Sequence, residues 1–194
     1  MRMFIALELP GPFADETEEL ARRLEATCAG RFVPAENRHL TLAFLGEGGE
    51  ADARLAMLAL DAACAGAGPV PLVAAGLGTF GRGRDATLWL GVEKNDELEG
   101  LAGRVRAELA ARGLAYDEKD FLPHVTLARR VRMPRGDLGD LAFPLPDEAR
   151  DVTHPRAVRR PLQAALHGGA LSGRTCEGDR AKGTVTFARP AFSR

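Results

Sequence analysis

Hydrophobic positions in the first part of the chain switch between two spacings, and this predicts strands and helices that alternate. Short apolar runs at 3–9 and 38–46 are typical of strands. Between them, residues 10–30 carry Leu20 and Leu24 at helical spacing and end on a glycine, which favours a helix. These spacings do not force a parallel sheet. The same reasoning predicts a helix over 51–68, a strand and loop over 69–81, a strand over 86–93, a helix over 95–113 and a strand over 123–130.

The chain also repeats itself at an offset of 85 residues without a gap. The first strand, 4–8, falls on 89–93, and the pattern His-x-Thr-Leu-Ala at 39–43 falls on the same pattern at 124–128. Apolar positions of the two intervening helices coincide as well. We therefore expect two similar lobes that face each other about a pseudo-twofold axis, with a cleft between them.

The repeat units span about 3–45 and 87–130 and leave a tail, 133–194, whose structure the pattern does not define. Prolines break this tail, and it has no sustained period. "GTVTFARP", at 183–190, could form a final strand.

Each repeat unit ends on a paired histidine and threonine. In a strand, residues i and i+2 point to the same side, so His39 shares a face with Thr41, and His124 shares a face with Thr126. If the lobes face each other, two imidazoles and two hydroxyls meet across one cleft. One such pattern alone would favour a structural histidine, whereas two at equivalent points of a repeat favour a functional pair.

Two histidines on opposite sides of a substrate are suited to concerted general acid–base catalysis. One takes a proton from the nucleophile while the other protonates the leaving oxygen. The hydroxyls of Thr41 and Thr126 can donate hydrogen bonds to oxygens on which negative charge develops. Phosphodiester transfer through a 2′,3′-cyclic phosphate fits this arrangement, because ribose supplies the neighbouring hydroxyl and no metal is needed. A metal site is disfavoured, because no carboxylate or third histidine stands at ligand spacing.

"HLTLAFLG" and "PHVTLARR" resemble the two His-x-Thr-x motifs of the two-histidine phosphoesterase superfamily, and within it the RNA 2′,3′-cyclic phosphodiesterases, historically called 2′-5′ RNA ligases. The likeness covers about residues 2–130 and includes "MFIALELP", "FVPAENRHLTLAFLG" and "LWLGV". It implies a single bilobal α+β domain over 1–194, with antiparallel sheets flanked by helices and the active site in the central cleft. The tail departs from the family, because we cannot place in 140–194 the serine-bearing strand and later tyrosine that members commonly have.

The resemblance implies metal-independent opening of a 2′,3′-cyclic phosphate to a 2′-phosphate, with no cofactor. His39 would be the proton donor to the 3′ oxygen, and His124 the base toward water. The implied partners are RNA ends or cyclic nucleotides, including tRNA halves, and 2′-5′ ligation would follow by the reverse chemistry. Three alternatives stay open: a relative that acts mainly as RNA ligase, one that acts on a small nucleotide such as ADP-ribose cyclic phosphate, and an RNA-end binding module without turnover.

Further substrate contacts are expected around the motifs. "GLGTFG", at 76–81, matches Gly-x-Gly-x-x-Gly but leads into a strand instead of a helix, which disfavours a dinucleotide-binding loop. Phe80 could stack on a base there, and Arg82 or Arg84 could meet phosphates, although a plain surface turn explains the stretch as well. Trp89 is interpreted as a core residue.

Arg129 and Arg130 directly follow the second motif. By strict alternation Arg130 shares the face of His124, while the family resemblance favours Arg129. Both are kept as candidates for binding the substrate phosphate.

Composition narrows the cellular setting. The three cysteines are odd in number and have no metal or redox spacing, and no stretch is long enough to cross a bilayer. We therefore expect a cytoplasmic protein without a membrane contact. Separately, we expect it to act as a monomer. A net charge of −1 argues against a protein that wraps duplex DNA. Residues 151–194 carry +5 and 1–150 carry −6, which indicates nucleic-acid contact or a solvated basic surface.

Overall fold

The computed structural model describes residues 1–82, 85–132, 152–153 and 184–188, and their elements make an α+β fold. Arg84 and most of the tail lie outside the described residues. The elements are β1 (Arg2–Glu8), α1 (Gly11–Glu25), β2 (Ala29–Phe32), the 3₁₀ helix η1 (Ala35–Asn37), β3 (His39–Glu47), α2 (Glu50–Cys64), β4 (Val70–Pro71), β5 (Ala74–Phe80), β6 (Ala86–Val92), α3 (Asp96–Ala111), β7 (His124–Arg132), β8 (Val152–Thr153) and β9 (Thr184–Ala188).

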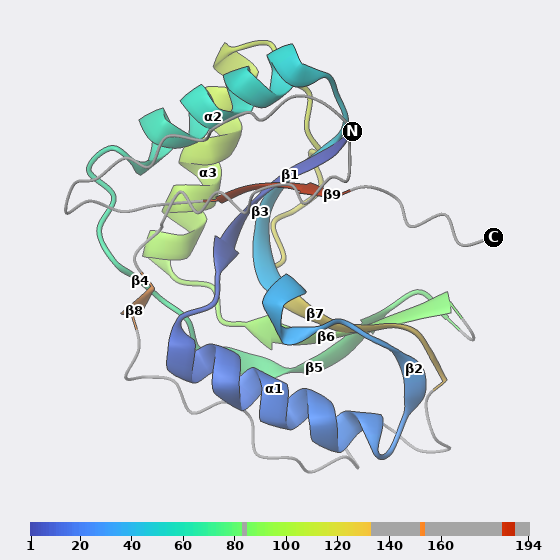
Figure 1. Ribbon diagram of the computed structural model, residues 1–194. Helices are drawn as coiled ribbons and strands as arrows, with labels where there is room; N and C mark the ends of the chain where they lie inside the picture. The colour runs from blue at the N-terminus through green and yellow to red at the C-terminus, as the bar shows by residue number, and fades with distance from the viewer. Residues whose placement is uncertain (83–84, 133–151, 154–183, 189–194) are drawn as a thin grey trace.

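One antiparallel sheet runs through both repeat units, in the order β5-β6-β7-β3-β1-β9, with β2 also paired to β7 (Figure 1). The two units meet where β3 and β2 of the first pair with β7 of the second. The predicted α+β class with antiparallel strands is confirmed, and the stretch 183–190 does contain a strand. The two predicted sheets are continuous with each other, and the bilobal arrangement stays a prediction.

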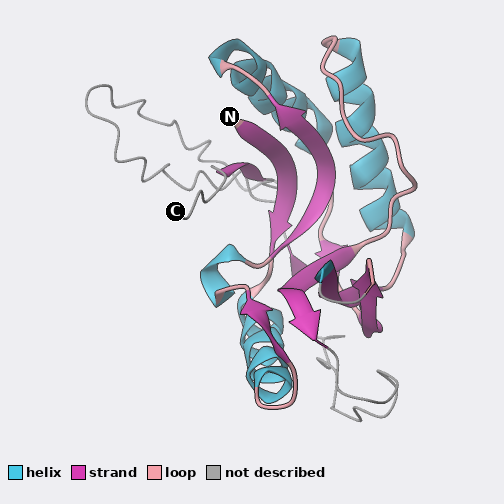
Figure 2. Cartoon of the chain, turned by 90° about the vertical axis from the view of Figure 1, so that its right-hand side faces the viewer, coloured by secondary structure: helices cyan, strands magenta, loops and turns pink. Residues whose placement is uncertain are grey.

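The helices α1 and α3 contact other strands than the one that precedes each of them. α1 follows β1 of the first unit but contacts β2, which pairs with β7 of the second, and lies in the half of the molecule that holds β5 and β6. α3 belongs to the second unit but contacts β3 of the first and packs on α2. Figure 2 shows the same separation, with α1 at the bottom of the molecule and the other two long helices at the top.

Each helix forms because its apolar residues fall on one stripe. α3 buries Leu98, Leu101, Val105 and Leu109, and its N-cap Asn95 accepts a hydrogen bond from the backbone N–H of Leu98 at 2.8 Å. Full burial of one such side chain contributes about 1.5–3 kcal/mol. α1 ends at Glu25, five residues before the predicted glycine, because the chain turns there to place β2 against β7. No described helix is long and apolar enough to span a membrane.

Register shifts in the two motif strands reveal how the repeat units correspond. Against β1, the strand β3 leaves Leu42 and Leu45 without a ladder partner, and against β6 the strand β7 leaves Leu127 and Arg130. Each of these extra residues in β3, which have no ladder partner, lies 85 positions before its counterpart in β7. These irregularities increase the local twist of both strands in the same places.

The first strands correspond at a different offset from the motif strands. Glu8 lies opposite His39 in one ladder, and Gly91 lies opposite His124 in the other, so β1 and β6 are related by 83 residues. The ungapped alignment is therefore wrong by two residues for these strands. The second unit has two more residues between its first strand and its motif, which an ungapped comparison cannot register. An even shift preserves the faces of the strand.

Candidate active site

The two motifs occupy equivalent positions in their strands. His39 begins β3 and His124 begins β7. In both, the histidine and the threonine are half-buried, while Leu40 and Val125, which follow the histidines, have no exposed surface. The predicted alternation therefore holds in this part of both strands, with the apolar side chains in the core and the polar ones on the opposite face.

The ladder between the motif strands brings the four polar residues together. Leu40 lies opposite Val125 in the antiparallel pair β3–β7. One step along this register places His39 beside Thr126, and one step the other way places Thr41 beside His124. Directly opposite residues have Cβ atoms about 4.5–5.5 Å apart, and diagonal neighbours about 7–8 Å. The two histidines therefore lie on one diagonal of the group and the two threonines on the other.

Both imidazoles are held in the same way by backbone carbonyls. The Nδ1 atom of His39 is 2.8 Å from the carbonyl oxygen of Asn37, and the Nδ1 atom of His124 is 2.7 Å from that of Leu122. A carbonyl oxygen only accepts hydrogen bonds, so Nδ1 carries a proton in each ring. Each histidine can therefore exchange a proton with a substrate only through Nε2.

An aromatic ring also contacts each histidine. Phe4, which is 8% exposed, stacks on His39 with ring centroids 4.6 Å apart and planes at 20°. Phe80 meets His124 edge-on, at 4.9 Å and 83°. Such pairs contribute about 0.5–1.5 kcal/mol beyond the buried area, and they oppose rotation of the imidazole.

Trp89 lies at the site, so its interpretation as a plain core residue was wrong. The indole is half-buried, 5.2 Å from the Phe80 ring and 6.0 Å from that of His124. It lies on glycines: a Cβ atom at Gly78 would overlap the indole Cζ2, and one at Gly91 would stand 3.1 Å from Cζ3. The Gly-x-Gly-x-x-Gly stretch is thus mostly strand β5, and one of its glycines makes room for Trp89.

Strict alternation fails after Thr126, and this changes which arginine faces the site. Because Leu127 is an extra residue in the ladder, Arg129 lies opposite Thr87, on the same face as Trp89 and Thr126. Arg130 occupies the next irregularity with φ 54°, a value that is uncommon for a residue other than glycine. Both arginines are exposed. Phe80 is also exposed, at 39%.

Each motif strand is tied to the segment that leads into the other motif. The N–H of Val33, which lies before His39, donates to the carbonyl of Leu127 at 2.8 Å. In the other direction, Nε of Arg106 donates to the carbonyl of Leu42 at 3.4 Å, and Nη1 donates to that of Lys119 at 3.0 Å. The extra residues of both strands thus accept hydrogen bonds from the opposite half.

The segment before His124 is fixed further on β3. The N–H of Asp117 donates to the carbonyl of Phe44 at 2.8 Å, and the guanidinium of Arg106 lies 5.9 Å from the Tyr116 ring and 5.6 Å from that of Phe121. Lys119 hydrogen-bonds to Asp117 and holds the pKa of this carboxyl below its usual range. Arg106 therefore connects the strand of one histidine to the approach of the other, a role that sequence reasoning missed.

Arg38 was also missed. It directly precedes His39, its side chain is 4% exposed, and it forms an ion pair with Glu18 of α1. Its Nε atom is buried and has no hydrogen-bond partner. A charged residue at the entrance to an apolar strand was the available signal, but the sequence alone does not pair it with a helix 20 residues earlier.

Among the described residues, no group of three or more histidine, cysteine, aspartate or glutamate side chains could hold a metal ion. The residues at the site can supply proton transfer by two imidazoles, hydrogen bonding by two hydroxyls, and charge from the arginines.

Comparison with known proteins identifies the family to which this fold and the paired motif belong. Residues 10–138 match the 2′-5′ RNA ligase superfamily, and the chain belongs to this family. A relative in Archaeoglobus fulgidus named RNA 2′,3′-cyclic phosphodiesterase is 30% identical over 73% of this chain and 78% of its own. A protein of the same name in Thermotoga maritima is 34% identical over 66% of this chain and 70% of its own. The crystal structure of E. coli LigT in apo form has a TM-score of 0.53 at 29% identity and covers 75% of this chain and 77% of that one.

Proposed function

We propose that the protein is an enzyme that hydrolyses RNA 2′,3′-cyclic phosphate ends to 2′-phosphates by metal-independent acid–base catalysis. The observation that carries the proposal is the pair of histidines: they have the same burial, the same Nδ1 hydrogen bond, and meet through the pair Leu40–Val125. The names of the relatives support the same reaction.

In the proposed reaction, Nε2 of His124 takes a proton from water, and the oxygen of that water forms a bond to phosphorus. The bond between phosphorus and the 3′ oxygen breaks, and Nε2 of protonated His39 gives its proton to this oxygen. The product is a 2′-phosphate beside a 3′-hydroxyl. His124 ends the reaction protonated and His39 neutral, and exchange with solvent restores both.

Residues beside the histidines stabilise the negative charge that develops on the phosphate. Thr41 and Thr126 donate hydrogen bonds to the non-bridging oxygens, where they act best in a partly buried site. One of the two arginines Arg129 and Arg130 binds the substrate phosphate, and Phe80 stacks on a base. We infer that the substrates are RNA ends or cyclic nucleotides, including tRNA halves, and that the protein acts as a cytoplasmic monomer over a single domain.

Product analysis on an oligonucleotide with a 2′,3′-cyclic end tests the proposal. A 2′-phosphate is expected, at a rate that excess chelator does not change, and with a bell-shaped pH profile because one imidazole must be neutral and the other protonated. A 3′-phosphate product would mean that the 2′ oxygen leaves, which would contradict the role of His39 as proton donor to the 3′ oxygen. Loss of activity with chelator would favour a metal-dependent reaction.

Ligation is the second candidate, because the same site run in reverse would join a cyclic end to a 5′-hydroxyl, and the matching superfamily carries that name. One preparation should be assayed on a cyclic mononucleotide, a cyclic-ended oligonucleotide, ADP-ribose cyclic phosphate and paired RNA halves. Tight binding of a 2′-phosphate end without turnover would instead indicate an RNA-end binding module.

A further inference from the structure

A row of residues crosses four strands on the face that carries the histidines. Phe80 of β5 lies opposite Thr87 of β6, Thr87 lies opposite Arg129 of β7, and Arg129 lies opposite Arg31 of β2. Cross-strand partners share a face. In agreement, Phe32, next to Arg31, packs against the core, whereas Arg31 is exposed.

This row lies close to the reacting group. Thr126 pairs with Trp89, and Arg129 pairs with Thr87, two residues further along β6. Two residues of a strand span about 7 Å. Arg31 and Arg129 therefore lie one row beyond the motif residues, on the same face of the sheet.

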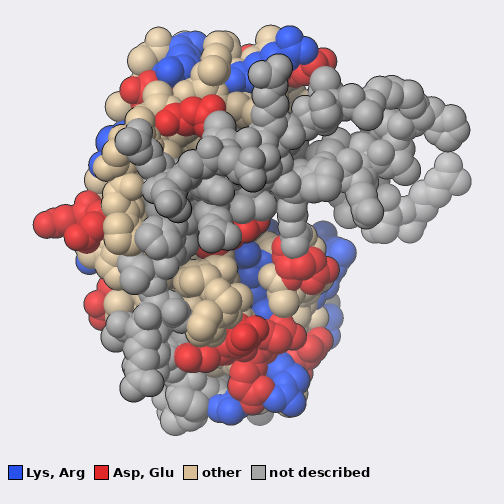
Figure 3. Space-filling model, turned by 60° about the vertical axis from the view of Figure 1, so that its left-hand side comes forward, with Lys and Arg blue, Asp and Glu red and all other residues tan. Residues whose placement is uncertain are grey.

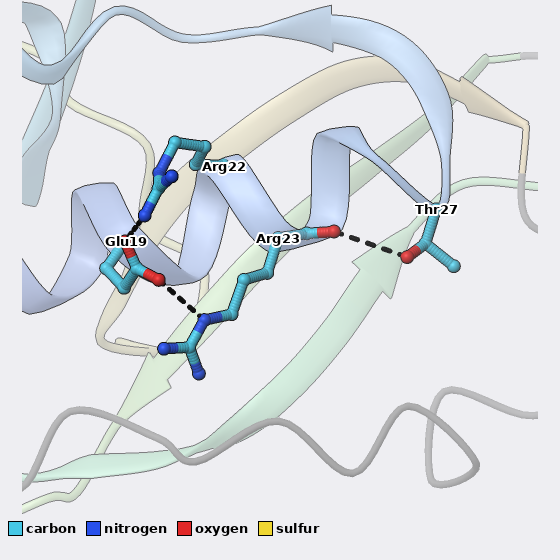
Figure 4. A network of polar contacts seen from close by, with 4 residues as sticks. All are labelled: Glu19, Arg22, Arg23 and Thr27. Atoms are coloured by element: carbon cyan, nitrogen blue, oxygen red, sulfur yellow. Dashed lines mark hydrogen bonds and ion pairs between the residues drawn. The ribbon is translucent and has the colours of Figure 1, made fainter.

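Arg31 and Arg129 differ from eight of the thirteen described arginines in having neither a carboxylate partner nor another polar or aromatic contact. On α1, Arg22 and Arg23 both bind Glu19 (Figure 4), and Arg38, Arg54 and Arg112 each pair with a glutamate. Among the residues that the structure describes, the arginines with neither an ion pair nor another polar or aromatic contact are Arg31, Arg82, Arg129, Arg130 and Arg132. All of them lie on or beside the same end of β5, β7 and β2.

Asp85, which is exposed directly before β6, lies at the same end of the sheet, whereas another group of acidic residues lies on α1. α1 exposes Asp15, Glu16 and Glu18, and Figure 3 shows acidic side chains gathered in the lower part of the view, at the level of α1. Like charges placed directly opposite each other in a ladder destabilise it. An anion that binds between Arg31 and Arg129 would remove this repulsion, and guanidinium groups match phosphate oxygens in a bidentate geometry.

We propose that Arg31 and Arg129 together bind the phosphodiester that joins the cyclic-ended nucleotide to the nucleotide before it. This inference rests on the proposed function and deepens it, because it makes the preferred substrate an RNA chain instead of a mononucleotide. Arg31 is then a specificity residue: it acts only when a second phosphate is present.

The test compares kcat/KM for a 2′,3′-cyclic mononucleotide and for a dinucleotide with the same cyclic end. The unchanged protein should prefer the dinucleotide, and Arg31→Gln should lower the ratio of the two values about tenfold, as expected for a charge-assisted bond to phosphate. The slope of log kcat/KM against log salt for the dinucleotide should become shallower by about 0.7. Arg54→Gln, on α2, removes the same charge far from the row and should leave ratio and slope unchanged.

Two further measurements keep the outcome unambiguous. Arg31→Lys keeps the charge but not the bidentate geometry and should give an intermediate ratio. The melting temperature of Arg31→Gln should not fall, because a like-charge contact is removed. An unchanged ratio, or an equal loss on both substrates, would overturn the inference while leaving the proposed function in place. Absence of turnover of either substrate by the unchanged protein would overturn both.

Discussion

Leu40 and Val125 lie opposite each other across β3 and β7, and both are completely buried. Each directly follows a catalytic candidate, His39 or His124. Because the side chain of one residue and the backbone of the next move together, the packing of this apolar pair sets the separation of the two imidazoles on the other face. The core and the proposed chemistry therefore meet at one ladder pair.

Leu40→Ala should lower the free energy of unfolding by about 2–5 kcal/mol, because it leaves a cavity at a fully buried position. Urea denaturation measures this loss. Leu58→Ala, at a position that is 55% exposed on α2, is the control and should change stability by less than about 0.5 kcal/mol. Equal effects in the two variants would contradict the placement of Leu40 in the core.

His39→Ala and His124→Ala should each lower the hydrolysis rate by about 10²–10⁴-fold, since each removes one proton-transfer group. Circular dichroism should show that both variants keep the fold. His167 is a histidine outside both motifs and outside the described residues. His167→Ala removes the same side chain, serves as the matched control and should keep the rate. Full activity in either motif variant would refute two-histidine catalysis.

Gly78→Ala should reduce kcat/KM and the melting temperature, because the new methyl group would overlap the Trp89 indole that lies near His124. Gly103→Ala on α3 is a matched control: a Cβ there has nothing within 4 Å. Removing this helical glycine should raise stability by about 0.4–1 kcal/mol. If Gly78→Ala kept its kcat/KM and melting temperature as Gly103→Ala does, the position of the Trp89 indole would not require a glycine at 78.

Arg106→Ala should lower kcat more than it raises KM, because the variant loses the bonds from α3 to Leu42 and Lys119 without removing a group that contacts substrate. A loss of about 1–3 kcal/mol of stability is expected as well. Arg104→Ala, which removes a single bond to the carbonyl of Ala63, gives the comparison. Steady-state kinetics of both variants measure kcat and KM separately. If Arg106→Ala changed only KM, Arg106 would contact the substrate directly.

Glu19 gives a pH-dependent contribution whose sign is fixed. Hydrogen bonds from Arg22 and Arg23 lower the pKa of its carboxyl in the folded state, so its stabilisation is present above the unfolded pKa and is lost as pH falls through the folded one (Figure 4). Glu19→Gln should therefore lower the melting temperature slightly at pH 7 and have no effect near pH 2. The effect is small because the pair is exposed to solvent. Melting curves of both proteins at pH 7 and near pH 2 measure this difference. A greater loss of melting temperature near pH 2 than at pH 7 would contradict the lowered pKa of Glu19.

Local patterns predicted much of this molecule. Apolar spacing predicted the long helices and the motif strands, because it depends only on which side of an element is buried. The repetition of His-x-Thr-Leu-Ala indicated the two histidines and threonines that the β3–β7 ladder brings onto one face.

Features set by distant parts of the chain escaped prediction. β2 forms because β7 offers it a partner, and the face of Arg129 depends on an irregularity at Leu127 that the sequence does not mark. Trp89 was misplaced because its neighbours Gly78 and Phe80 come from another strand. The bonds of Arg106 likewise depend on tertiary packing.

The packing of α3 on the first repeat unit has a consequence for how far one unit could fold alone. A second unit alone would leave the apolar side of α3 uncovered, because this helix packs on β3 of the first unit and on α2. Two identical copies could hide those surfaces only by exchanging helices, as subunits do in domain-swapped dimers. The described helices and strands have the arrangement that such an exchange would give within a single chain.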